Sequence, residues 1–231
     1  MALPALIFDV DGTLAETEEG HREAFNSVFA AHHIPWHWDR EVYRELLRVT
    51  GGKERMLHYA RQHDPERLPE IERRLAELHA DKNARYGEWV RAHGGGLRPG
   101  VRELIAAAQS RGQPLAIVTT TSRSNIEALL EAAFGAEGKT KFSAIVCGED
   151  VGAKKPDPEA YLIALDTLAL ESEDAIALED SRNGMRAAIA AGLRTVITPS
   201  FYSAHENFAG AWRVFETLEV ATREEPALLG G

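Results

Sequence analysis

Short apolar runs alternate with helical patterns over residues 98–197, and this alternation constrains the fold more than any other feature. The runs at 115–118, 144–147, 175–178 and 195–197 have the length and composition of buried strands. The segments between them carry apolar residues at helical spacing. Such alternation predicts an α/β fold, in which a parallel sheet is covered by helices on both faces.

A further apolar run, residues 6–8, leads directly into two carboxylates, Asp9 and Asp11, followed by Gly12. Residues i and i+2 of an extended chain share a face, so both carboxylates leave the strand end in the same direction. Two carboxylates held this close are costly unless a cation lies between them or one is protonated. The pair predicts a metal site with an aspartate nucleophile, although a calcium loop or a solvated turn would explain these residues equally well.

A helical segment without a convincing strand, residues 16–87, separates this turn from the alternating region. Its apolar spacing predicts four helices, the last begun by Asp64 as N-cap with Pro65 after it. We expect a core domain formed by residues 1–15 and 88–231, and a helical cap domain at 16–87. The large aromatic side chains of the segment are predicted to form the cap core: Phe25, Phe29, Trp36 and Trp38.

Polar residues follow four of the predicted strands. Asp9 follows the first strand, Thr119 the second, Lys155 lies in the loop after the third, and Glu179 and Asp180 follow the fourth. In open parallel sheets the carboxyl ends of the strands form the crevice where ligands bind. Convergence of these side chains at one edge favours a catalytic site over a calcium loop.

The residue types suggest a division of labour for phosphoryl transfer. Oxygen ligands from Asp9, the backbone of Asp11 and Asp180 suit Mg²⁺, which shares phosphate oxygens with its substrate. Glu179 could be a ligand or an outer carboxylate. Lys155 would offset the negative charge that phosphate and carboxylates accumulate.

The composition of the chain limits the classes of molecule that it is expected to bind. Lys and Arg number 26 against 36 Asp and Glu, and the net charge of −10 disfavours nucleic acid and anionic membranes. The single Cys147 excludes an internal disulfide and is expected to be a buried apolar residue. No apolar run approaches the roughly 18 to 20 residues of a membrane span, and no signal peptide is recognisable. We expect a monomer that acts on a small phosphorylated molecule, located in the cytoplasm or, if the chain is the mature form of an organelle protein, in the chloroplast stroma. The tail, 224–231, is expected to be frayed.

These residues resemble the four ordered motifs of the haloacid dehalogenase superfamily of phosphohydrolases. The matching segments are Asp9-Val10-Asp11-Gly12-Thr13, Thr119, Lys155-Pro156 and Leu178-Glu179-Asp180-Ser181. The resemblance implies a Rossmann-like core in which Asp9 is the nucleophile, Asp11 the general acid and then base, and Thr119 and Lys155 stabilise the phosphate. It also implies a Mg²⁺ site with the ligands Asp9, Asp11, Glu179 and Asp180.

The helical insertion resembles the small four-helix cap of the β-phosphoglucomutase-like subgroup. Within that subgroup, the segments around Glu16 and His21, from Thr50 to Arg55 and from Pro199 to Tyr202 are similar to the CbbY branch. That branch is associated with dephosphorylating xylulose 1,5-bisphosphate, an inhibitor of the Calvin cycle enzyme Rubisco. The residues expected to bind substrate are Glu16, His21, Arg48, Lys53, Arg55 and Thr120.

Other interpretations stay open at this point. A phosphomutase would use the same carboxylates but return the phosphoryl group to its substrate, and the motifs do not separate it from a phosphatase. A non-catalytic binding protein would be expected to have lost Asp9, Asp11 or Lys155, and all three are present. Arg48 and Arg55 would also suit a solvated helical face.

Overall fold

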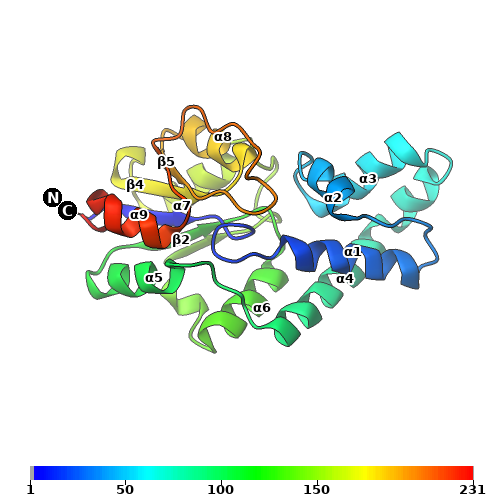
Figure 1. Cartoon of the computed structure of the whole chain (residues 1–231), viewed down its shortest axis with the longest axis horizontal. Helices are drawn as coiled ribbons and strands as arrows, with labels where there is room; N and C mark the ends of the chain where they lie inside the picture. The colour runs from blue at the N-terminus through cyan, green and yellow to red at the C-terminus, as the bar shows by residue number, and fades with distance from the viewer. Residues whose placement is uncertain (1–2, 231) are drawn as a thin grey trace.

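A parallel six-stranded sheet forms the centre of the larger lobe (Figure 1). The structure, a computed structural model, describes residues 3–230. The strand order is β3-β2-β1-β4-β5-β6, and every neighbouring pair is parallel, which confirms the predicted α/β fold. The strands are β1 (Ala5–Phe8), β2 (Leu115–Val118), β3 (Ala144–Val146), β4 (Ala175–Glu179), β5 (Arg194–Ile197) and β6 (Arg213–Val214).

Helices cover both faces of the sheet, as predicted. Because successive side chains of a strand point to opposite faces, Leu6 and Phe8 of β1 join one apolar cluster while Ala5 and Ile7 join the other. The first cluster is completed by α5, α6 and α9, and the second by α7 and α8. These helices are α5 (Val101–Ser110), α6 (Arg123–Phe134), α7 (Glu159–Leu168), α8 (Arg182–Ala190) and α9 (Leu218–Glu224).

The smaller lobe is the helical cap, with a hydrophobic cluster of its own. It contains α1 (Glu18–Ala31), α2 (Arg40–Leu46), α3 (Gly52–His63) and most of α4 (Leu68–His93), and α1 and α4 lie side by side (Figure 1). The aromatic residues expected in the cap core are all buried there: Phe25, Phe29, Trp36 and Trp38.

Helix α4 begins later than predicted and continues past the expected domain boundary. Asp64 ends α3 as its C-cap, and residues 65–67 form a turn, so the expected N-cap at Asp64 is wrong. The helix then runs without interruption past residue 87 to His93. Its last turns join the apolar cluster of the larger lobe through Tyr86 and Val90. The expected domain boundary at residue 87 therefore lies inside one continuous helix.

The C-terminal region also differs from the prediction. Strand β6 was not expected, because both of its residues are exposed and form no apolar run. Residues Pro226–Leu229 form a short 3-10 helix in which Leu228 is buried, and the Gln113 amide donates to the Leu228 carbonyl at 2.8 Å. The expected fraying is therefore wrong for the described part of the tail. Across residues 3–230, none of the helices is long and apolar enough to cross a membrane.

Candidate active site

The Lys155 ammonium group occupies the centre of the site at the carboxyl ends of the strands. Its Nζ donates to Asp9 Oδ1 at 2.7 Å, to Glu179 Oε1 at 2.6 Å and to the Val118 carbonyl at 2.9 Å. These acceptors follow or end β1, β4 and β2, so three neighbouring strands converge on one buried cation. Burial opposes the charge, but the two carboxylates outweigh it and raise the pKa of Lys155.

Three buried carboxylates surround this lysine. Oxygens of Asp9, Glu179 and Asp180 lie within 4.8 Å of one another. Burial, with repulsion from Glu179, raises the pKa of Asp9 to about 8 although Lys155 opposes the shift. Burial and repulsion from Asp9 likewise raise the pKa of Asp180. A divalent cation would offset the repulsion among these carboxylates, and an all-oxygen donor set suits a hard cation such as Mg²⁺.

Glu179 differs from the other two carboxylates because its oxygens already have protein partners. Oε1 accepts from Lys155 and from the Tyr161 hydroxyl at 2.8 Å, and Oε2 accepts from the Asp180 backbone amide at 3.2 Å. A Cβ at Gly184 would overlap this carboxylate, so the first turn of α8 closes over it. These contacts favour a role for Glu179 as an outer carboxylate that orients Lys155. They disfavour a role for Glu179 as a direct metal ligand.

The Asp9–Asp11 turn depends on Gly12. Its φ of +87° lies in the left-handed region, and a Cβ there would overlap the Asp180 carboxylate. Glycine therefore permits both the sharp turn after Asp11 and the close approach of β1 and β4 at their ends.

Asp11 faces a different set of partners from those of Asp9. Its Oδ1 accepts from the Thr17 hydroxyl and from His21 Nε2 at 3.0 Å, and His21 Nδ1 in turn accepts from Lys82 Nζ at 2.7 Å. When Lys82 is protonated its ammonium group can only donate, so His21 then accepts at Nδ1 and donates to Asp11 from Nε2. Burial opposes ionisation of Asp11, but the attraction and hydrogen bond of His21, helped by Thr17, lower its pKa to about 2.

Two adjoining pockets lie between the lobes. The catalytic pocket is lined by Asp9, Asp11, Lys155 and Asp180 from the larger lobe and by Gly51 and Arg55 from the cap. The cap pocket continues from it and is lined on the cap side by the cationic groups of Lys53, Arg55 and Lys82, with Lys154 from the larger lobe. Thr120 borders both pockets.

The structure brings four of the six expected substrate-binding residues to these pockets. Thr120 and Arg55 line both, and His21 and Lys53 line the cap pocket. Arg55 is buried, and its guanidinium donates to the Tyr43 hydroxyl at 3.0 Å and the Leu46 carbonyl at 3.2 Å. It therefore does not lie on a solvated helical face.

Glu16 and Arg48 are not brought to either of the two pockets within the described chain. The Arg48 side chain is 68% exposed and pairs with Glu45 at 2.8 Å, which is the solvated arrangement considered above. Glu16 pairs with Arg98 at 3.2 Å beside the start of the cap. Arg98 Nη1 also donates to the Gly12 carbonyl, so Glu16 lies against the support of the Asp11 turn.

The residues beside Lys155 and after the second strand differ from one another in their surroundings. Thr119 is buried, and its hydroxyl accepts from the Thr121 amide at 3.2 Å, whereas Thr120 faces the pockets. Lys154 turns away from Asp9 and pairs with Glu54 of the cap at 2.6 Å. The lysine against the candidate nucleophile is therefore Lys155.

A family model described as a haloacid dehalogenase-like hydrolase matches residues 3–192. The chain belongs to the haloacid dehalogenase-like hydrolase family. The predicted superfamily is thus confirmed, and this hydrolase carries all of its four motif segments at the carboxyl edge of one sheet.

Relatives of the chain within the family agree with the predicted CbbY branch. A plasmid-encoded CbbY protein of Cupriavidus necator is 49% identical over 218 residues, which cover 94% of this chain and 86% of that protein. A crystal structure of CbbY from Rhodobacter sphaeroides in complex with phosphate is 49% identical, covers 94% of this chain and 95% of that chain, and has a TM-score of 0.87. A mutant of the same protein was crystallised with xylulose-(1,5)bisphosphate and matches equally well.

A more distant relative is named for its reaction. A phosphorylated carbohydrates phosphatase of Thermotoga maritima is 30% identical and covers 84% of each chain. With the family match, these relatives show that the chain is an enzyme of the phosphoric monoester hydrolase class, as predicted.

Lys82 is a functional candidate that the sequence interpretation missed. It is buried on α4, between Leu78 and Tyr86, which are also buried and lie four residues away on either side. A lysine in the apolar stripe of an amphipathic helix is a signal that was present in the sequence. Its partner His21 lies 61 positions away in the chain, so the contact itself could not be inferred.

Proposed function

We propose that this hydrolase is a Mg²⁺-dependent phosphatase that removes one phosphate from a sugar bisphosphate, with xylulose 1,5-bisphosphate as the first candidate. The observation that carries the proposal is the pair of adjoining pockets, one with the buried Lys155 cluster and one lined by cationic side chains. A substrate with two phosphate groups needs two such anion sites. The similarity to a CbbY protein crystallised with xylulose-(1,5)bisphosphate supports the choice of sugar.

The reaction proceeds in two transfers. An Asp9 oxygen attacks phosphorus, an Asp9 O–P bond forms, and the bond from phosphorus to the sugar oxygen breaks. Asp11, which is ionised in the free protein because its pKa is about 2, takes up a proton when substrate binds and then gives it to the leaving sugar oxygen. It then removes a proton from the water that attacks the aspartyl phosphate, which restores Asp9 and releases inorganic phosphate. Lys155 stays against Asp9 and balances the negative charge in both steps.

The metal fits the carboxylates that have free oxygens. Asp9, Asp180 and the backbone carbonyl of Asp11 would hold Mg²⁺, while Glu179 acts from outside through Lys155. A bound Mg²⁺ supplies charge neutralisation for the transferring phosphoryl oxygens.

The cap supplies specificity for the rest of the substrate. In a protein with a net charge of −10, Lys53 brings a positive charge to the cap pocket, where the neighbouring Lys154 is paired with Glu54. Lys53 lies in the first turn of α3, directly after Gly51, which lines both pockets, and Gly52, which lines the cap pocket. A phosphate held there would orient the sugar and help to exclude water from Asp9.

A phosphate-release screen tests the proposal. Sugar monophosphates and bisphosphates, including xylulose and ribulose 1,5-bisphosphate, are incubated with the protein and Mg²⁺. We expect fastest release from a bisphosphate, and no turnover of any ester by Asp9→Asn. The control Asp166→Asn changes an exposed carboxylate of α7 and should retain wild-type rates. Substantial turnover by Asp9→Asn would rule out the covalent mechanism.

Product analysis separates the phosphatase from the phosphomutase considered above. Net release of inorganic phosphate in an amount equal to the substrate consumed is expected for a phosphatase. An isomerised sugar phosphate without phosphate release would identify a mutase instead.

A further inference from the structure

One side chain of the larger lobe is buried in the cap. Tyr202 lies in the loop after β5, yet it is only 5% exposed and belongs to the hydrophobic cluster of the cap. Its ring meets the Tyr43 ring of α2 edge-on, with centroids 5.6 Å apart and an interplanar angle of 82°. The cap core is therefore completed by a residue that the sheet domain supplies.

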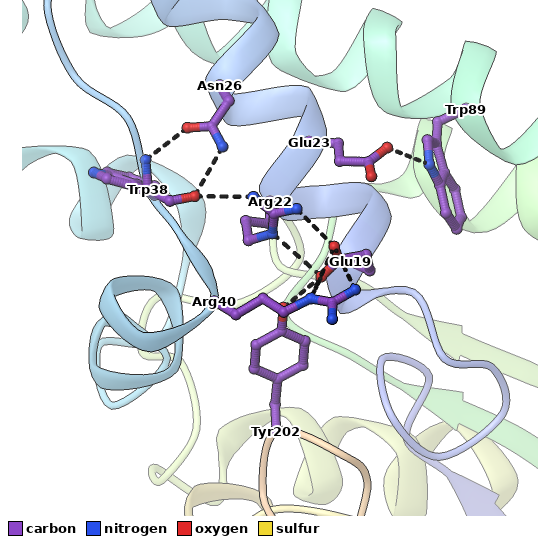
Figure 2. A network of polar contacts seen from close by, with 8 residues as sticks. All are labelled: Glu19, Arg22, Glu23, Asn26, Trp38, Arg40, Trp89 and Tyr202. Carbon is purple, nitrogen blue, oxygen red and sulfur yellow. Dashed lines mark hydrogen bonds and ion pairs between the residues drawn. The ribbon is translucent and has the colours of Figure 1, made fainter.

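The Tyr202 hydroxyl is fixed by a carboxylate at the start of the cap. It donates to Glu19 Oε2 at 2.6 Å, and Figure 2 shows the hydroxyl pointing up into the cluster around Glu19. Arg22 and Arg40 also bind Glu19, at 2.6 and 3.2 Å. The hydrogen bond from Arg22 is the main cause that lowers the pKa of Glu19 to about 2, so the acceptor is ionised at neutral pH and the Tyr202 bond is charge-assisted.

The loop that carries Tyr202 also contacts the candidate metal site. Ser203 Oγ donates to Asp180 Oδ2 at 3.0 Å and accepts from the Ser200 amide at 2.8 Å. At the other end of the loop, Arg98 donates to the carbonyls of Thr198 at 2.6 Å and Pro199 at 2.8 Å. The same guanidinium binds the Gly12 carbonyl, so the loop is fixed to the turn that carries the nucleophile.

We propose that Tyr202 is a positioning residue. Its hydrogen bond to Glu19 holds the cap over the catalytic pocket and fixes the position of the cap relative to Asp180. The inference rests on the proposed function, since it assigns the contact that stabilises the closed arrangement in which a bisphosphate reaches both pockets. Residues 199–203 form a strap from the core to the cap, separate from the two chain crossings near Thr17 and within α4. Opening the cap breaks the Tyr202–Glu19 bond and uncovers the Tyr202 ring.

Kinetics of Tyr202→Phe test the strap, because phenylalanine keeps the ring against Tyr43 and removes only the hydroxyl. Loss of a hydrogen bond to a charged group should raise KM for the sugar bisphosphate about tenfold by depopulating the closed state. Values of kcat/KM for p-nitrophenyl phosphate, which is too small to fill the cap pocket, should stay within about twofold of wild type. An equal loss on both substrates, or no loss on the bisphosphate, would overturn the proposal.

Matched variants of α1 identify the acceptor. Glu19→Gln should produce the same split between the two substrates, and combining it with Tyr202→Phe should add little further loss. Glu23 lies one turn further along the same helix and accepts from Trp89 of α4 at 2.9 Å and, among the described residues, has no hydrogen bond to the strap (Figure 2). Glu23→Gln should therefore leave KM for the bisphosphate unchanged. Additive losses in the double variant would show that Glu19 and Tyr202 act independently.

A distance measurement tests the strap without any substrate. Nitroxide labels at Arg73→Cys on α4 and Glu171→Cys in the larger lobe occupy exposed positions, while Cys147 is buried. Pulsed dipolar spectroscopy should give a broader distribution with longer distances for Tyr202→Phe than for wild type. Identical distributions would overturn the strap. If the wild type releases no phosphate from any sugar ester, the proposed function fails, while this measurement still decides the strap.

Discussion

Asp9 and Asp11 stand two positions apart, yet their environments drive their pKa values in opposite directions. Asp9 lies among buried carboxylates, and its pKa is raised to about 8, whereas Asp11 accepts hydrogen bonds from Thr17 and His21, and its pKa is lowered to about 2. The proposed roles require each state to change: a cation bound at Asp9 would displace its proton, and Asp11 would take one up when substrate binds. The donors to Asp11, Thr17 and His21, belong to the entrance and first helix of the cap.

Lys82 is buried and contacts His21, the partner of Asp11. Lys82→Met tests whether this buried group titrates. Burial lowers the pKa of Lys82 to about 7, below the unfolded value of about 10.4. Between these values the unfolded chain binds more protons than the folded one. The stability of the wild type should therefore rise with pH from 7 to 10, relative to the methionine variant, by at most about 1.4 kcal/mol per pH unit.

Urea unfolding of the two proteins at pH 7 and pH 10 measures this difference. Lys139→Met, at an exposed lysine on the surface of the larger lobe, is the control and should follow the wild type. Equal pH dependence of wild type and Lys82→Met would contradict the burial of an ionisable group at this position. The methionine variant should also lose activity on the bisphosphate, because His21 then lacks the donor that fixes its tautomer.

Two basic residues near the start of α3 differ in their surroundings. Lys53 lines the cap pocket, whereas Arg48, five positions earlier, is exposed and paired with Glu45. Lys53→Ala should weaken the use of a bisphosphate about tenfold or more while a small generic ester is affected little, because only the bisphosphate needs a second cation.

Steady-state kinetics on both substrates give the comparison, with Arg48→Ala as the matched control. That control removes a cation of similar sequence position but outside both pockets, so we expect wild-type values. If Arg48→Ala and Lys53→Ala lose the same activity, or if Lys53→Ala loses both substrates equally, the second-phosphate role of Lys53 is wrong.

The elements that carry the catalytic pocket were predictable because each couples an apolar run to a polar residue at its end. β1, β2 and β4 are such runs, and parallel strands place their carboxyl ends at one edge. By contrast, β6 is two residues long and both residues are exposed. Tyr202 of the strap at 199–203 contacts Glu19, which lies 183 positions earlier in the sequence. Neither local periodicity nor turn composition encodes a contact at that separation.

The two lobes are joined more extensively than the predicted domain division implies. α4 begins in the cap and ends in the apolar cluster of the larger lobe, and the strap closes the opposite side through Tyr202. The catalytic pocket lies between these connections and receives Arg55 from the cap and Lys155 from the sheet. Both pockets are therefore lined by residues of both lobes, which is suited to a substrate that must occupy them at the same time.

The effect of Mg²⁺ on the thermal stability of the protein should depend on the protonation of Asp9. The pKa of Asp9 is about 8 in the folded protein and about 3.9 in an unfolded chain, so the folded state binds the additional proton between these values. The stabilisation from this proton is complete below about pH 4 and is lost as the pH rises through 8. Mg²⁺ binds the folded state in competition with that proton, so the increase in Tm on adding Mg²⁺ should be larger at pH 8 than at pH 5.

Thermal unfolding with Mg²⁺ and with a chelator, at both pH values, measures the effect. Asp9→Asn has no titratable carboxyl group at this position. The Tm shift caused by Mg²⁺ should therefore be smaller in this variant and should depend less on pH. The distant Asp166→Asn should behave as the wild type, since its carboxylate is exposed on α7. A Mg²⁺ shift that is equal at pH 5 and pH 8, or unchanged in Asp9→Asn, would place the cation away from Asp9 and the cluster around Lys155.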